Sequence, residues 1–570
     1  MRVSRRVCLL VLVGAVAIAL VVWYTHIRKP SVEKTIEPGS LERASERVLG
    51  FFGPSEDEEE KQDVGKLYAI LMQEQMSSWE KRDKREPKEL ISVLRSEPNA
   101  VGRVRAALAL GQIGGKAAVE ALIEALQDRR AIVRVAAASA LQELKDKRAI
   151  DPLRKLAKTD KSPGVRSAAV GALAEIGADD AVEVLINALG DKDETVRKSA
   201  LSRLSYDERY KGDKRVVDAF IKALQTDPSP WVREEAARAL CILNDPRVVP
   251  ALIEALNEEN FYIRIYAARA LGRIGDRRAV EPLAKILSRE VVREGSDMPS
   301  QVSFLSTVAD SLGEIGDSRA VTPLIQALYH KEQTVRTGAA KAPQPPVPVG
   351  GIRTSAAEAL LKLDVTGAEG ELVQALQNVS EDVLPYVARM LGNARAQTAV
   401  EPLIRLMQTS KGETRKEAAA ALGNIRDTKA VAPLIEVLND PFPSVRKSSA
   451  VALGKIGDKS AIEPLKPLLK DSNEGVQLAA TVALNTIGDN STKELLEKLL
   501  NEDYDNEACD LLVELRNYFV VPHLLTLISG AKRDVALYYL REISGQDYQY
   551  DVNKWREWWE QHPNNPNKKK

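Results

Sequence analysis

The sequence predicts an all-α solenoid of stacked helix pairs, preceded by one apolar transmembrane helix. Three observations predict this fold. A motif with a fixed arginine recurs roughly every 30 residues along most of the chain, the period of helical repeat arrays. At 570 residues the chain exceeds what a single core can fill, so an array is expected. Hydrophobic residues make up 44% but aromatics only 5%, which suits thin, closely packed helices.

The first element is an apolar stretch at the N-terminus. Residues 1–6 are basic, and 7–27 are predicted to be a transmembrane signal-anchor helix, because the run VCLLVLVGAVAIALVVWY is uncharged and ends on an interfacial Trp-Tyr pair. A cleaved signal peptide stays open, since Ala15-Val16-Ala17 has the form of a cleavage site. The first reading places the N-terminus in the cytoplasm and the solenoid outside it, in a single-pass membrane protein. The second makes the protein secreted.

The following segments are assigned by composition. Residues 28–61 are expected to form an acidic juxtamembrane linker, and 62–87 a helix that caps the first repeat. The repeat solenoid is assigned to 88–545, with a proline-rich insert at 341–353 that cannot continue a helix. Residues 546–562 are expected to form an aromatic C-terminal cap, and 563–570 a polar tail.

Each repeat encodes two helices. The fullest copies are VRKSSAVALGKIGDKSAIEPLKPLL (Val445 to Leu469) and IRIYAARALGRIGDRRAVEPLAKIL (Ile263 to Leu287). Small residues such as Ala267 in the first helix allow close packing, and a Gly-Asp pair such as Gly275-Asp276 ends that helix. A proline such as Pro282 opens the second helix, where the missing amide costs nothing.

This pattern resembles the HEAT-repeat superfamily, in particular the short bacterial subtype named after phycobilin lyases. The resemblance implies a HEAT/armadillo-like, right-handed α-α superhelical solenoid. It also implies binding of other proteins by the repeats. A lyase-like or other enzyme-associated role, with chromophore attachment as in the namesake enzymes, is the alternative that the resemblance brings.

The recurring arginine has two interpretations. In HEAT arrays such an arginine pairs with the aspartate of the turn in a structural ladder that links repeats, and the other reading is a stripe that binds anions. We favour the ladder, since each arginine has a repeated aspartate available. The ladder residues are Arg105, Arg134, Arg166, Arg197, Arg233, Arg264, Arg336, Arg415 and Arg446.

No residue can be assigned a catalytic, cofactor-binding or metal-binding role. The cysteines form no CxxC pair and the four histidines stand in no recognisable catalytic motif, so no metal, no cofactor and no enzymatic activity are expected. Nucleic-acid binding is a second alternative, but 81 basic residues balance 81 acidic ones, so nucleic acid is not an expected partner.

The C-terminal segment carries Trp555, Trp558 and Trp559 at the spacing of one helix face. They are expected to cap the last repeat, and a partner-docking patch is the alternative. Taken together, the sequence predicts a membrane-anchored HEAT-repeat scaffold that binds an unidentified protein partner, with the membrane contacted through the N-terminal helix.

Overall fold

The computed structural model describes residues 86–178, 180–291, 299–330, 351–502, 506–529 and 532–562. Within these ranges the chain forms α-helices and short 3-10 helices and no strand, so the all-α prediction is confirmed. The chain divides into two compact units, Met1–Ala270 and Leu271–Lys570, and the boundary falls within α16 (Phe261–Ile274).

In the unit Met1–Ala270, the described residues form two layers of helices. The first helices of its repeats are α6 (Ala100–Ile113), α8 (Ala131–Leu144), α10 (Pro163–Ile176), α12 (Glu194–Tyr206) and α14 (Pro230–Leu243). The second helices are α5 (Pro87–Ser96), α7 (Lys116–Ala125), α9 (Ile150–Thr159), α11 (Ala181–Ala188), α13 (Lys214–Thr226) and α15 (Val249–Ala255). Each first helix packs on the next, from α6 to α14, and on the second helix before it. This is the stacking expected of a solenoid.

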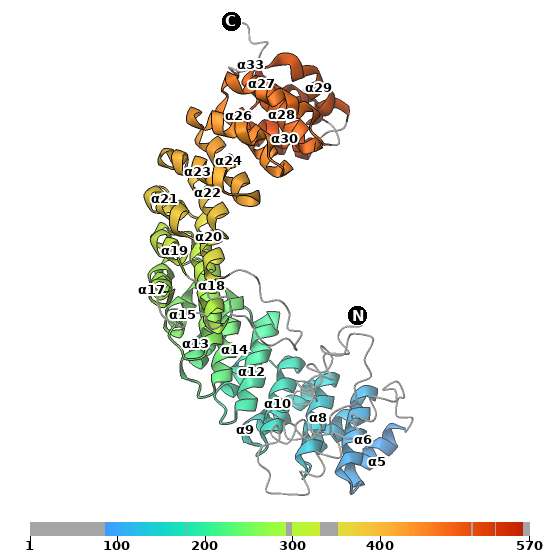
Figure 1. Cartoon of the computed structure of the whole chain (residues 1–570). Coiled ribbons are helices and arrows are strands. Elements are labelled where there is room, and N and C mark those ends of the chain that lie inside the picture. Colours follow the sequence, from blue (N-terminus) through green and yellow to red (C-terminus); the bar gives the residue numbers. More distant parts are fainter. Residues whose placement is uncertain are drawn as a thin grey trace, which may run out of the picture. The chain divides into compact units, whose positions relative to one another are not determined.

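The unit Leu271–Lys570 has the same two layers. Its first helices are α18 (Pro299–Ile315), α20 (Ile352–Leu361), α22 (Leu384–Asn393), α24 (Gly412–Ile425), α26 (Pro443–Ile456), α28 (Glu474–Ile487), α30 (Asn506–Glu514) and α32 (Arg533–Ser544). Its second helices are α17 (Val280–Val291), α19 (Val321–Ala327), α21 (Glu369–Asn378), α23 (Val400–Thr409), α25 (Val431–Glu436), α27 (Ile462–Leu465), α29 (Lys493–Glu502) and α31 (Val521–Leu527), followed by α33 (Val552–Gln561). In Figure 1, the second helices α17, α19, α21 and α23 follow one side of this unit, and the first helices α18, α20, α22 and α24 follow the other side.

The predicted Gly-Asp turn joins the two helices of a repeat. At Gly457 the backbone takes φ +77°, and the Asp458 carboxylate accepts a hydrogen bond from the Ser460 amide at 2.8 Å. Glycine is suited to this left-handed position because it has no Cβ. Short 3-10 helices follow such turns or stand at the equivalent place: η1 (Lys147–Ala149), η2 (Glu208–Tyr210), η3 (Pro246–Val248), η4 (Arg277–Ala279), η5 (Ser318–Ala320), η6 (Gln397–Ala399), η7 (Thr428–Ala430), η9 (Lys459–Ala461), η11 (Asn490–Thr492) and η12 (Tyr518–Val520). Two more, η8 (Val437–Asn439) and η10 (Lys466–Lys470), end second helices.

Small residues set the distance between neighbouring first helices. A Cβ added at Gly423 on α24 would lie 2.6 Å from the Cα of Ala452 on α26, closer than two carbons can approach. Gly392 on α22 faces Ala421 on α24 at the same 2.6 Å. The glycine of one first helix therefore touches the backbone of the next, as the small-residue pattern predicts.

Several predicted segments lie outside the described residues. These are the transmembrane helix at 7–27, the linker at 28–61, nearly all of the capping segment at 62–87, most of the insert at 341–353 and the tail at 563–570. None of the helices in the described ranges has the length and apolar character needed to cross a bilayer.

Candidate functional site

The recurring arginines connect successive repeats. Arg134 Nε and Nη2 each donate to the Asp160 carboxylate at 2.8 Å, and Nη1 donates to the Asp128 carbonyl at 2.9 Å. One guanidinium thus contacts both the segment that precedes its repeat and the segment that follows it. Equivalent ion pairs are Arg103–Asp128, Arg166–Asp191, Arg197–Asp227, Arg233–Glu258, Arg415–Asp440 and Arg446–Asp471.

The position of these pairs differs from the predicted ladder in two ways. Arg105 is exposed, and the guanidinium of its repeat comes from Arg103, which stands four residues after the N-cap Asn99. Residue 105 therefore points to another side of the helix. The carboxylates differ from the prediction as well, because they belong to the segment that connects one repeat to the next. The aspartate of the Gly-Asp turn instead pairs with its own neighbour, as Asp276 does with Arg278 at 2.7 Å.

Arg264 and Arg336 are two further predicted ladder positions. Arg264 occupies the ladder register four residues after Asn260, and its amide donates to the Asn260 carbonyl. Arg336 lies outside the described residues. Gln477 takes the place of an arginine in α28, and its Nε2 donates to the Asp471 carbonyl at 2.6 Å, so the backbone contact is kept without the ion pair.

The guanidinium of Arg134 is largely saturated with hydrogen bonds, whereas Nε of Arg233 is buried without a hydrogen-bond partner. Arg134 Nη1 also reaches the Arg129 carbonyl at 3.3 Å, so both terminal nitrogens and Nε already donate to protein oxygens. Hydrogen bonding to Arg446 holds the pKa of Asp471 below its ordinary value, despite partial burial. A guanidinium bound on this many sides has little capacity for an anion.

An exposed aromatic patch, which sequence reasoning missed, lies on the first helices of Met1–Ala270. We define the aromatic patch as Trp231 on α14 and Tyr262 on α16, whose exposed fractions are 39% and 49%. Tyr206, 62% exposed, is the last residue of α12 and stands at the other end of the first helices. Lys198 Nζ lies 4.2 Å from the centre of the Trp231 ring, which ties α12 to α14. Asn260, just before α16, donates to Glu234 of α14 at 3.4 Å and places Tyr262 at the same surface.

Charges around the aromatic patch are paired. Arg238 Nε donates to the Glu235 carboxylate at 3.0 Å, and its guanidinium carbon lies 5.1 Å from the Tyr206 ring centre. Hydrogen bonding to Glu235 raises the pKa of Arg238, while burial raises the pKa of Glu234. Because the charges compensate one another, contact with a ligand would depend mainly on the ring surfaces.

A signal for the patch is present in the sequence. Trp231 and Tyr262 stand two residues before Arg233 and Arg264. The equivalent position holds a non-aromatic residue in other repeats: Ile132, Gly164, Thr195, Ser444 and Gly475. A comparison of repeats at this register position would have identified Trp231 and Tyr262, but not Tyr206, since α12 has Thr195 there.

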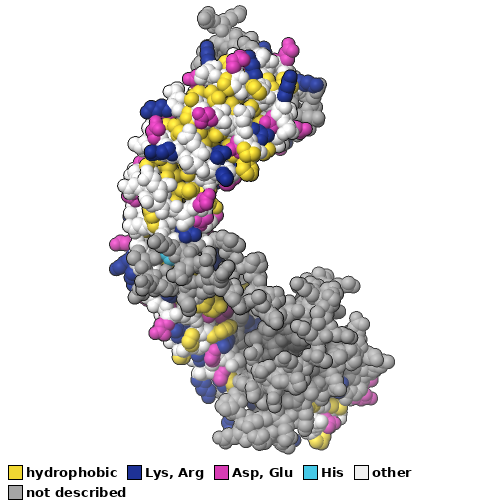
Figure 2. All heavy atoms as spheres, viewed as in Figure 1, with side chains coloured by type: hydrophobic (Ala, Val, Ile, Leu, Met, Phe, Trp, Pro, Cys, Tyr) yellow, Lys and Arg dark blue, Asp and Glu magenta, His cyan; other side chains and the backbone are white. Residues whose placement is uncertain are grey.

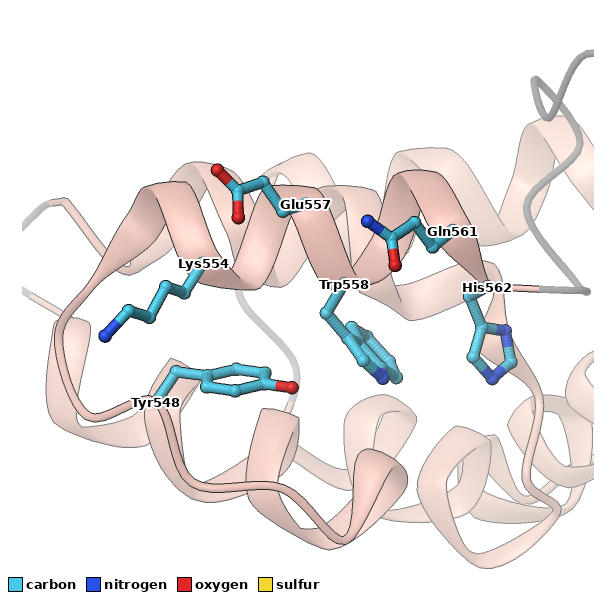
Figure 3. A pocket seen from close by; sticks show the side chains of 6 residues that line it. All are labelled: Tyr548, Lys554, Glu557, Trp558, Gln561 and His562. Carbon is cyan, nitrogen blue, oxygen red and sulfur yellow. The ribbon is translucent and has the colours of Figure 1, made fainter.

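The three predicted cap tryptophans have different environments. Trp555 is fully buried and its Nε1 donates to the Gln549 carbonyl at 2.8 Å, while Trp559 is buried and stacks on Tyr518 with ring centres 6.3 Å apart. Trp558 is half-buried and lines a pocket of about 490 Å³. In Figure 3 the ring of Trp558 lies in a row with those of Tyr548 and His562 beneath α33. Trp555 and Trp559 therefore hold α33 in place.

Among the described residues no group of three or more His, Cys, Asp or Glu side chains is arranged to hold a metal ion. On the face of the Leu271–Lys570 unit seen in Figure 2, Lys and Arg side chains are interspersed with Asp and Glu.

Two protein-family models match this chain. The model for HEAT repeats matches residues 87–174, 157–219, 217–296, 369–451 and 431–514, and the model for the PBS lyase HEAT-like repeat matches 306–330. The predicted resemblance to HEAT repeats and their phycobilin-lyase-like subtype is thereby confirmed.

Curated relatives cover shorter parts of the chain. The bilin biosynthesis protein PecE of Mastigocladus laminosus is 38% identical over 111 residues, which are 19% of this chain and 41% of PecE. The phycocyanobilin lyase subunit alpha of a Picosynechococcus species is 39% identical over 82 residues, 13% of this chain and 31% of the relative. The chain thus spans less than half the length of these relatives. A solved structure that also matches is the complex of CpcE and CpcF of phycocyanin lyase from Nostoc, with 22% sequence identity and a TM-score of 0.25. The match covers 54% of this chain and 94% of the matched chain in that complex.

These relatives correct one prediction. The sequence was expected to encode no enzyme, but the curated relatives described above include a bilin biosynthesis protein and a lyase subunit. The lack of a recognisable catalytic motif was therefore the wrong basis for that prediction.

Proposed function

This chain belongs to the HEAT-repeat family, and on that premise we propose that it is a scaffold that binds a partner protein through the aromatic patch of Met1–Ala270. The single observation that supports this is the exposure of Trp231 and Tyr262 at the same position of two consecutive first helices. Tyrosine and tryptophan are the residues most enriched in the energetic centres of protein interfaces.

The surroundings of the patch support recognition of a protein. Lys198 and Arg238 lie over the Trp231 and Tyr206 rings and hold these side chains in place before any ligand arrives. Side chains that are ordered in advance lose less conformational entropy on binding. Ile242, 40% exposed at the other end of α14, occupies the position that Tyr206 has on α12 and adds a second apolar side chain there.

The proposal can be tested by site-specific photocrosslinking in the source cells. A photoreactive phenylalanine analogue at position 231 or 262 of the full-length chain should crosslink one protein reproducibly. The double substitution Trp231→Ala and Tyr262→Ala should abolish co-purification of that protein. Tyr329→Ala serves as control, because Tyr329 has the same 39% exposure as Trp231 but follows a second helix. Equal recovery with the double variant would contradict the proposal.

The curated relatives favour a second candidate, a lyase-type role in bilin chemistry. In this case the full-length chain would bind a bilin, alone or with a partner subunit. Phycocyanobilin mixed with the purified chain should then show a shifted visible absorption band and induced circular dichroism. An unchanged spectrum, with and without the crosslinked partner, would remove this candidate.

We also propose that residues 7–27 anchor the repeat array to a membrane, with the array on the extracytoplasmic side. The support is the uncharged run from Val7 to Tyr24 behind a basic N-terminus. The full-length chain should stay with membranes in alkaline carbonate, and external protease should reach the repeats. A mature protein that starts shortly after Ala17 or Ala19 would instead establish a cleaved signal peptide.

A further inference from the structure

A groove of about 430 Å³ crosses the first helices α24, α26 and α30 in the unit Leu271–Lys570. One wall carries lysines and the facing wall carries carboxylates. The lysines are Lys416, Lys447 and Lys455, and the carboxylates are Glu507, Asp510 and Glu514. We call these the lysine wall and the carboxylate wall.

Small residues open this groove. The register position that holds Trp231 and Tyr262 in the aromatic patch holds Ser444 on α26 and Gly475 on α28. A Cβ added at Gly475 would lie 3.5 Å from Glu507 Oε1 and 3.9 Å from Lys447 Cδ. Because α28 carries no side chain there, residues of α26 and α30 meet across it.

The two walls are joined at both ends by ion pairs. Lys447 pairs with Glu507, 60 residues further along the chain, and Lys455 Nζ lies 2.7 Å from Glu514 Oε1. Between them, Asp510 accepts a hydrogen bond from the Tyr539 hydroxyl at 2.8 Å, which fixes this carboxylate. Burial and this hydrogen bond together raise the pKa of Tyr539. The opposite charges are thus held in place before a ligand arrives.

We propose that this groove binds an extended segment of a partner protein in which acidic and basic side chains alternate. Successive side chains of an extended chain point to opposite sides. Acidic side chains of the segment would face the lysine wall, and basic ones the carboxylate wall. When the segment binds, the two cross-groove ion pairs open, and their four side chains pair with charges of the segment. Every charge is therefore compensated in both the free and the bound state.

The length of the groove suits a short extended segment. Lys447 and Lys455 are separated by about two helical turns, roughly 12 Å. About four residues of extended chain span that length, so a segment of this size reaches both ends of the groove.

This inference rests on the proposed scaffold function only in taking a protein segment as the ligand. The groove and the aromatic patch share no residue. Trp231→Ala with Tyr262→Ala therefore tests the patch alone, and the experiment below tests the groove alone.

The test is fluorescence anisotropy with labelled peptides and the full-length chain. The probe has the core Glu-Lys-Glu-Lys between Gly-Ser flanks, and the comparison peptides carry four glutamates, four lysines or four serines. The alternating peptide should bind at least tenfold more tightly than the other three, and added salt should weaken its binding. Tighter binding of the all-Glu or the all-Lys peptide, or equal binding of the serine peptide, overturns the proposal.

A charge swap supplies the matched variant. Lys447→Glu with Glu507→Lys retains the cross-groove ion pair while it reverses one charge on each wall. Each wall then carries both signs, so the swap should weaken binding of the alternating peptide at least tenfold. The control swap is Lys493→Glu with Glu497→Lys, an exposed pair on α29 outside the groove. Unchanged helicity by circular dichroism shows that the variants fold. If the variant Lys447→Glu with Glu507→Lys binds the alternating peptide as tightly as the unsubstituted chain does, the proposal is refuted.

Discussion

Arg446 on α26 donates to the two carboxylate oxygens of Asp471 at 2.8 and 2.7 Å, and to the Asp440 carbonyl at 2.8 Å. The arginine and aspartate side chains are 13% and 10% exposed. One guanidinium therefore bridges the links before and after its repeat inside a mostly dry environment. A bidentate pair of this kind has fixed geometry, and loss of one partner leaves the other charge buried.

Replacement of Arg446 tests this bridge. Arg446→Ala should destabilise the region around α26 and α28 by about 3 kcal/mol, because Asp471 is left without its counter-charge. Arg446→Gln should cost less, since Gln477 shows that glutamine at this position keeps the backbone hydrogen bond. Hydrogen exchange of the full-length chain should show roughly 100-fold faster exchange in these helices for the alanine variant. Arg95→Ala, at an exposed pair with Glu124, should change nothing measurable.

The depressed pKa of Asp471 predicts acid sensitivity. Its pKa lies lower in the folded chain than the value of about 3.9 expected when unfolded, so the folded state binds the proton less readily. The stabilisation is complete above about pH 4 and is lost as the pH falls through the folded pKa. Urea unfolding followed by circular dichroism between pH 7 and pH 2 should show this loss. The Asp471→Asn variant should be less stable than the unsubstituted chain at pH 7. Its free energy of unfolding should fall less than that of the unsubstituted chain as the pH is lowered. An unchanged pH profile in that variant would contradict the assignment.

Helix spacing predicts the effect of one methyl group. Gly423→Ala should destabilise the chain by about 1 to 3 kcal/mol, because the new Cβ would overlap the backbone of Ala452. Gly370→Ala on α21 has no atom within 4 Å and should be neutral or slightly stabilising. Thermal unfolding of the two variants side by side measures the difference. Equal melting temperatures would mean that α24 and α26 can move apart without cost.

The C-terminal tryptophans predict unequal effects. Trp555→Ala should cost about 3 to 5 kcal/mol locally and release α33, because this indole is fully buried. Trp558→Ala should leave α33 in place, since the ring contacts of Trp558 are to Trp555 and Trp559 of the same helix and to His562 just after it. Limited proteolysis should cut the C-terminus readily in the first variant alone. Equal protection of both variants would show that α33 is held by other contacts.

The sequence by itself determined the repeat architecture of this protein. The signals for helix, turn and small-residue packing repeat locally, so the Gly-Asp turn at Gly457 and the close contact at Gly423 follow from short motifs. The ladder register was harder to predict. A rule based on the residue before arginine selected Arg105, but the N-cap at Asn99 sets the helix phase and places Arg103 in the pair.

Tertiary structure decided which of the charged and aromatic side chains meet. The HEAT motif does not specify that Trp231 lies beside Lys198, since that contact depends on how α12 and α14 stack. Lys447 and Glu507 are 60 residues apart and meet because α28 presents Gly475 between them. Such contacts depend on the spacing of whole helices, which is the sum of packing along the array. Local sequence signals describe each repeat, whereas the surface between repeats exists only after they are stacked.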